Sequence, residues 1–229
     1  MNHAHSKLLT IALASACACS AATAQDARFG QVTASSDTWD RLTATGASIT
    51  GACNASANDS VNDGVPYELY YIRTGDFSPI LDIRVYSLEP APLDFDPFIA
   101  VYCDSFDPNF PNTNLLHVDD DSAGYPNAHA FFPFAGIDPN SLYIAVVSSY
   151  SNFPQSQYGN FEISLGNGLY FSRRCLADFN DDGEVDFVDV SLFISLFTAM
   201  HPDADLNYDG STDFVDISLF LSDYTAGCP

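Results

Sequence analysis

The most constraining feature of this 229-residue chain is an internal repeat near its C-terminus. The segment from Ala177, ADFNDDGEVDFVDVSLFISLF, returns 27 residues later from Ala204 as ADLNYDGSTDFVDISLFLSDY, with 13 of 21 aligned residues identical. Such a repeat indicates one structural unit used twice. Residues 175–229 contain twelve acidic residues and no lysine or arginine, whereas residues 25–174 contain eighteen acidic residues and six arginines. This break in composition predicts two domains, residues 25–172 and residues 175–229.

Each copy of the repeat spaces its oxygen-bearing side chains as a calcium-binding loop does. Ca²⁺ takes six to eight oxygen ligands in tolerant geometry, and a glycine at loop position 6 allows the sharp turn. Mg²⁺ fits less well because it prefers to keep its own water ligands. Two Ca²⁺ ions are therefore predicted. Their ligands at positions 1, 3, 5, 7, 9 and 12 are Asp178, Asn180, Asp182, Glu184, Asp186 and Asp189 in the first loop, and Asp205, Asn207, Asp209, Ser211, Asp213 and Asp216 in the second.

A solvated acidic turn is the alternative interpretation, because Asp, Asn and Gly are common turn residues. Two copies in register, each followed by an apolar run at helical spacing, favour calcium. We expect these runs to form two helices that pack together through one shared core. The residues assigned to that core are Val190, Phe193, Ile194 and Phe197 with Ile217, Phe220, Leu221 and Tyr224, and Leu192, Leu196 and Leu219 widen the two faces.

The N-terminus has the pattern of an export signal. Lys7 precedes an apolar run over residues 8–14 that is too short to span a bilayer. The small residues Ala22, Thr23 and Ala24 then form a cleavage pattern. An amphipathic helix or a membrane anchor is the alternative. We expect residues 1–24 to be a removed signal peptide and the mature chain to be exported, without a transmembrane segment, to the medium, the cell surface or the periplasm.

Export changes the interpretation of the cysteines. After cleavage four remain, and in an oxidising compartment they are expected to form two disulfides in one of three connectivities. The break in composition favours Cys53–Cys103 and Cys175–Cys228.

The front domain has short β-branched and aromatic runs separated by Asn, Asp, Pro and Gly. This pattern predicts a mainly β domain, an antiparallel β-sandwich or jelly roll. Together with the repeat, it gives a mainly β front domain followed by a small helical calcium domain of paired EF-hand-like loops. The expected strands are residues 66–73, 80–86, 98–102, 141–147 and 160–165.

Charge and motifs limit the function. Residues 25–229 have a formal net charge of −24, which disfavours nucleic acid and anionic membranes as partners. No catalytic motif accompanies the mature histidines, and no catalytic residue is assigned. His117 beside the acidic residues 119–121 could belong to a metal or acid–base site, but a solvated turn is the simpler interpretation. Acidic pairs such as Asp104 and Asp107 could serve glycoside hydrolysis, and Asp94 with Asp96 is another such pair. The many aromatic residues keep a carbohydrate-binding protein as the alternative function.

Residues 175–229 resemble a dockerin, with two F-hand calcium loops that each have only an exiting helix. The ADFNDDGEVDF opening and the terminal Gly227-Cys228-Pro229 resemble Gly-Cys-ending dockerins of exported planctomycete-type bacterial proteins. The resemblance implies docking to a cohesin-like or other envelope or scaffold protein, in an assembly that degrades polysaccharide. Polar residues are usual at loop positions 10 and 11, but here these are Phe187 and Val188, and Phe214 and Val215. We therefore expect a more apolar receptor at these four side chains.

Residues 45–166 also resemble, more loosely, a secreted pre-peptidase C-terminal type of β-sandwich. Strands similar to YELYYIRT, YIAVVSSY and YGNFEISL carry this likeness. The resemblance implies a noncatalytic accessory domain that the C-terminal module docks or anchors.

Overall fold

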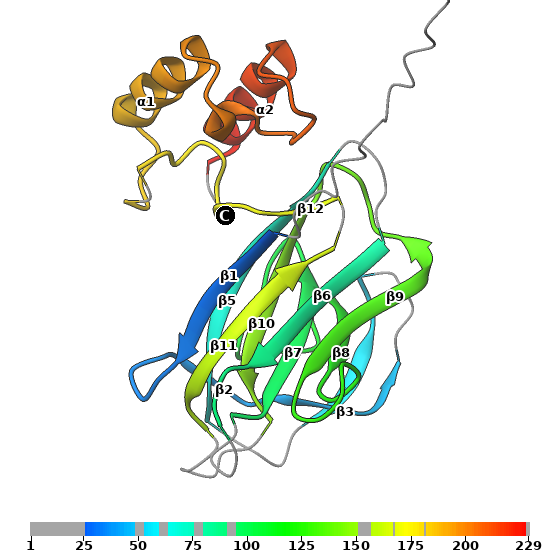
Figure 1. Cartoon of the computed structure of the whole chain (residues 1–229). Coiled ribbons are helices and arrows are strands. Elements are labelled where there is room, and N and C mark those ends of the chain that lie inside the picture. The colour runs from blue at the N-terminus through cyan, green and yellow to red at the C-terminus, as the bar shows by residue number, and fades with distance from the viewer. Residues whose placement is uncertain are drawn as a thin grey trace, which may run out of the picture.

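The computed structural model describes residues 26–48, 53–59, 64–75, 80–90, 95–150, 157–166, 168–180 and 182–227. The predicted signal peptide, residues 1–24, lies outside these residues. Antiparallel strands dominate the described part, and two α-helices follow them at the C-terminal end (Figure 1). The mainly β class is therefore confirmed.

The larger sheet has the strand order β12-β5-β10-β7-β8, with β2 also paired to β5, and its ladders are antiparallel. Its central register pairs Ala145 with Tyr70 on one side and with Val101 on the other. The strands are β2 (Thr38–Trp39), β5 (Val65–Thr74), β7 (Pro97–Cys103), β8 (Leu115–Asp119), β10 (Leu142–Ser149) and β12 (Leu169–Phe171).

The smaller sheet has the order β1-β11-β6-β9 and is also antiparallel. A separate two-stranded ladder is formed by β3 and β4. The bounds are β1 (Asp26–Val32), β3 (Leu42–Ser48), β4 (Ser56–Asp59), β6 (Ile80–Ser87), β9 (Ala128–Gly136) and β11 (Gly159–Leu165).

The two larger sheets pack face to face over one apolar core. Strand β6 alternates, so that Leu81, Ile83 and Val85 are buried while the side chains between them face outward. Every residue of β7 is buried instead. Its inward residues join the core between the sheets, and its opposite face joins a second core around Trp39. A strand covered on both faces is expected to be apolar along its whole length.

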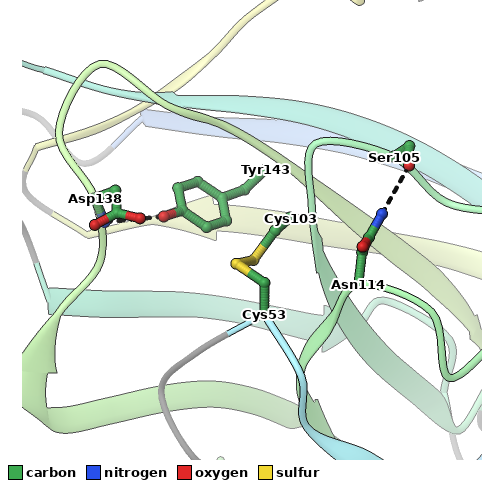
Figure 2. Close-up of a disulfide and its surroundings, with 6 residues drawn as sticks. All are labelled: Cys53, Cys103, Ser105, Asn114, Asp138 and Tyr143. Atoms are coloured by element: carbon green, nitrogen blue, oxygen red, sulfur yellow. Dashed lines mark hydrogen bonds between the residues drawn. A yellow bond between two sulfur atoms is a disulfide. The ribbon is translucent and has the colours of Figure 1, made fainter.

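A disulfide lies beside the core between the two sheets, to which Cys103 belongs. Cys53 and Cys103 are bonded, with Cα atoms 5.7 Å apart, so the segment before β4 is joined to the end of β7 (Figure 2). In the same region the Asp138 backbone N–H donates to the Tyr143 hydroxyl over 2.9 Å. The predicted Cys53–Cys103 pairing is confirmed. Cys175 is also disulfide-bonded, but Cys228 lies outside the described residues, and its pairing with Cys175 stays a prediction.

The C-terminal unit contains α1 (Phe187–Thr198), the short 3₁₀ helix η1 (Pro202–Ala204) and α2 (Phe214–Ala226). The helices meet through Phe193 and Phe220, whose rings stack in parallel with centroids 4.3 Å apart. The predicted helical core is correct at these two positions. It is wrong at Ile194 and Leu221, which are 54% and 51% exposed, and Leu192 is exposed too, because helical spacing does not show how wide a stripe the neighbouring helix covers.

The helical unit contacts the β domain at the end where β12 lies (Figure 1). Arg73 of β5 forms an ion pair of 3.2 Å with Asp223 of α2. The rings of Tyr170 and Tyr208 stack with centroids 4.5 Å apart and planes 4° apart. The Tyr208 hydroxyl donates to the carbonyl oxygen of Phe171 over 3.3 Å. The contacts of Tyr208 hold the second loop of the repeat against β12, and the ion pair holds α2 against β5.

Within the described residues, no helix has both the length and the apolar character needed to cross a membrane.

Candidate functional site

The two loops of the repeat fold in the same way from their first residue. The position-1 aspartate, Asp178 or Asp205, accepts the backbone N–H of position 5 at 3.2 Å in both copies. Its second oxygen accepts the N–H of the position-6 glycine at 3.0 and 2.8 Å. Gly183 and Gly210 have φ values of 85° and 87°, a left-handed conformation that favours glycine. The sharp turn expected of a calcium loop is present twice.

Positions 3, 5 and 7 continue this geometry. The side-chain oxygen of Asn180 accepts the Asp182 N–H at 3.1 Å, and Asn207 accepts the Asp209 N–H at 3.2 Å. Asp182 in turn accepts the N–H of Glu184 at 2.9 Å. The equivalent bond, from Ser211 to Asp209, is 2.8 Å long. These local hydrogen bonds join the side chains of positions 3 and 5 to the backbone of each turn.

Positions 9 and 12 join each loop to its helix. Asp186 and Asp213 cap α1 and α2, and each helix start is a capping box. The position-12 carboxylates, Asp189 and Asp216, are 0% exposed. Each accepts two backbone N–H groups from residues 2 and 3 of its loop and one from its capping residue, the shortest at 2.7 Å. The last predicted ligand of each loop therefore lies next to the first three residues.

The charges of the loops are balanced mainly by backbone N–H groups. Burial opposes ionisation of Asp189, but hydrogen bonds from Asp186, Phe179 and Asn180 outweigh it and lower its pKa. Burial raises the pKa of Asp205, and the nearby charges of Asp216 and Asp209 act in the same direction. In the described part of the chain no ion pair reaches Asp189 or Asp216. A cation would relieve this crowding of carboxylates.

The chemistry of the donor set fits a hard cation. Each loop offers carboxylates, one asparagine amide oxygen and the position-7 main-chain carbonyl, which are the ligand types that Ca²⁺ takes. Among the described residues, no group of three or more His, Cys, Asp or Glu side chains converges as a metal site. The calcium sites at the twelve named positions therefore stay a prediction that rests on donor chemistry and on loop geometry.

The start of each helix presents an apolar pair to solvent. Phe187 and Phe214 are both 77% exposed, and Val188 and Val215 are 49% and 45% exposed. Exposed large apolar side chains that recur at equivalent places are typical of an interaction surface. We call these four residues the apolar face.

The predicted position of His117 in a solvated turn is wrong. It is in the middle of β8 and only 6% exposed, not in a solvated turn. Burial lowers its pKa to about 4, so its imidazole is neutral at pH 7. Asp104 and Asp107 lie in the segment that follows β7, where Asp107 accepts the backbone N–H of Asn109. Asp94 lies outside the described residues.

Two clusters of charged side chains could not be predicted from the sequence. On the smaller sheet, His129 Nε2 lies 2.9 Å from Asp82 Oδ1, and Arg84 Nε lies 3.3 Å from the same oxygen. Strands β6 and β9 bring these residues together although 47 residues separate Asp82 from His129. The second cluster is a group of arginines at the junction of the two domains. The adjacent Arg173 and Arg174 marked only a boundary in the sequence.

Comparisons with protein-family models, with curated proteins and with solved structures found no match. The function is therefore argued from the geometry of the chain itself.

Proposed function

We propose that this chain is an exported, noncatalytic β protein whose C-terminal dockerin-like module binds two Ca²⁺ ions and docks to a scaffold protein. One observation carries the proposal: two loops with matching hydrogen bonds each lead into a helix that begins with an exposed apolar pair. The duplication thus repeats both the oxygen donors and the surface beside them.

The role of the metal would be to order the module. Without a cation, the loop carboxylates repel one another, and residues 175–229 contain no basic side chain to offset them. A bound ion would neutralise the loops and hold the two helix starts in place. A module of this size gains much of its stability from such ions, because its apolar core is small.

The partner is expected to be a cohesin-like or other scaffold module with an apolar surface surrounded by basic residues. The apolar face requires a surface that shields phenylalanine and valine from water. The twelve acidic residues of residues 175–229 would attract a basic rim and speed association. Docking should therefore weaken as the salt concentration rises.

Calorimetric titration of oxidised residues 25–229 with Ca²⁺ tests the metal sites. We expect two ions per chain, and Asp178→Ala or Asp205→Ala should each reduce this number to one. Asp120→Asn is the matched control, since it removes one negative charge outside the repeat. Absence of heat at millimolar Ca²⁺, or loop variants that still bind two ions, would overturn the calcium assignment.

Docking is tested separately with a panel of purified cohesin-like modules in calcium buffer. We expect the double variant Phe187→Ser/Phe214→Ser to lose capture while it keeps both metal ions. Ile80→Ser serves as the control, because Ile80 is an exposed apolar residue of the β domain. Calcium binding without capture by any module of the panel would refute docking and leave the metal sites intact.

A further inference from the structure

A cleft of about 540 Å³ lies between the β domain and the helical unit. Arg28 of β1 lines it, and so do Arg173 and Arg174 from the connection that leaves β12. Residues 25–229 contain six arginines and no lysine. Half of the permanent positive charges of this region therefore line a single cleft, although the region carries a net charge of −24.

The other three arginines are neutralised or covered. Arg73 pairs with Asp223 at 3.2 Å, and Arg84 pairs with Asp82 at 3.3 Å. Arg41 lies between the rings of Phe98 and Tyr150, at 4.5 and 4.6 Å from their centroids. Arg73 and Arg84 therefore have carboxylate partners, and Arg41, which forms no ion pair with a described residue, is only 2% exposed.

The arginines of the cleft differ, because within the described residues none of them forms an ion pair and none is buried. Arg28 lies over the ring of Phe171 at 4.5 Å, and Arg173 lies over Phe179 at 4.2 Å. An aromatic ring covers the flat face of a guanidinium and leaves the N–H groups at its edge free. The Nη1 atom of Arg173 is buried with no hydrogen-bond partner in the described structure. Free guanidinium edges are the groups that bind carboxylate and sulfate oxygens.

The cleft also contains negative charge, from Asp203 and Asp205. Asp205 is a predicted calcium ligand, so its carboxylate belongs to the second loop. With three arginines and two aspartates, the lining has a net positive charge even when the Asp205 carboxylate is counted in full. An incoming oxyanion would relieve the repulsion among the arginines.

A second cavity, of about 200 Å³, continues from the first along the outer face of the larger sheet. Tyr71 and Arg174 line both cavities. Beyond them the second cavity is lined mostly by apolar and aromatic side chains, including Leu69 and Phe106, together with the polar Asp104 and Ser105. A matching ligand would carry an acidic group for the arginines of the first cavity. Next to that group it would have a weakly polar ring for the aromatic lining of the second cavity.

We propose that this interdomain cleft binds an acidic sugar. Its oxyanion, a carboxylate or a sulfate ester, lies between Arg28, Arg173 and Arg174, and the next sugar ring lies along Tyr71 toward the second cavity. The ligand is a short oligosaccharide or a chain end, because the strong negative charge of the protein repels long polyanions.

Calorimetric titration of oxidised residues 25–229 in calcium buffer tests this site. The probes are trigalacturonate, a sulfated disaccharide, the neutral trisaccharide maltotriose and inorganic sulfate. We expect binding of at least one acidic sugar, with weaker or undetectable binding of maltotriose and of inorganic sulfate. The tighter of the two acidic probes identifies the oxyanion that the arginines recognise.

Arg174→Gln and Arg28→Gln should each weaken binding of that sugar roughly tenfold, because a charge-assisted contact is lost. Arg84→Gln is the matched control, because it makes the same charge change on β6 at a residue that does not line the cleft, and it should bind normally. Circular dichroism of each variant checks that it is folded. The inference is overturned if neither acidic sugar binds, if inorganic sulfate binds equally well, or if Arg84→Gln has the same effect as the cleft variants.

Discussion

Acid should destabilise the β domain through one residue, His117. Its ring is buried in β8, and its Nδ1 atom has no hydrogen-bond partner among the described residues. Burial lowers its pKa from 6.5 to about 4, the charge of Asp119 acts in the opposite direction, and that of His129 lowers the pKa further. Protonation would place a second N–H and a positive charge inside an apolar region.

The sign and size follow from linkage. The unfolded chain binds a proton at His117 near pH 6.5, whereas the folded chain does so only near pH 4. Stability is therefore complete above pH 6.5 and is lost as the pH falls toward 4. For this pKa difference the loss is about 2 kcal/mol between pH 7 and pH 5, and it reaches about 3 kcal/mol at pH 4.

Urea unfolding of oxidised residues 25–229 and of the His117→Gln variant, each at several pH values, measures this term. All other titratable groups, including the carboxylates of the two repeat loops, are the same in both proteins, so the difference between the two curves isolates His117. We expect the stability advantage of the histidine form to shrink by about 2 kcal/mol from pH 7 to pH 5. NMR titration of the ring gives the folded pKa directly. Parallel curves, or a ring that titrates near pH 6.5, would refute the reasoning.

Three further changes have defined outcomes. Replacing both Cys53 and Cys103 with serine removes a cross-link between residues 50 positions apart. We expect the free energy of unfolding, measured in urea, to fall by about 4 kcal/mol, and an unchanged midpoint would contradict this. Phe193→Ala should destabilise the helical unit by about 3–5 kcal/mol and lower its far-UV helical signal, whereas Phe187→Ala, at an exposed position, should not. Asp223→Asn leaves the guanidinium of Arg73 without its carboxylate, and it should cost about 1–3 kcal/mol by urea unfolding; a neutral result would show that the pair contributes nothing.

The strands that could be predicted from sequence are those with a strong local signal. Strands β5, β6, β7, β10 and β11 are rich in β-branched and aromatic residues, and each was located within one or two residues of its bounds. Strand β3, LTATGAS, and strand β8, LLHVD, are short or contain small and polar residues. Their conformation depends on pairing with distant strands, which single-sequence patterns do not contain.

The candidate sites divide in the same way. The loop residues could be named in advance because all predicted ligands of one loop lie within twelve consecutive positions and the pattern occurs twice. The arginine cleft could not, because Arg28 and Arg173 are far apart in sequence and meet only after β1 and β12 are placed. The helical period also did not show that Phe193 is buried and Ile194 exposed. Adjacent residues on a helix can lie on opposite sides of the border between the buried and the exposed face.

The contacts of Tyr208 give the two halves of the repeat different mechanical roles. This residue belongs to the second loop, and it both stacks on Tyr170 and donates to Phe171, while Asp223 of the helix that follows is paired with Arg73. The second half of the repeat is therefore fixed to the β domain by direct contacts, and the first half is positioned through its packing against the second. A partner bound at the helices would therefore keep a fixed orientation relative to the β-sandwich. A flexible linker between the two units would instead allow many orientations.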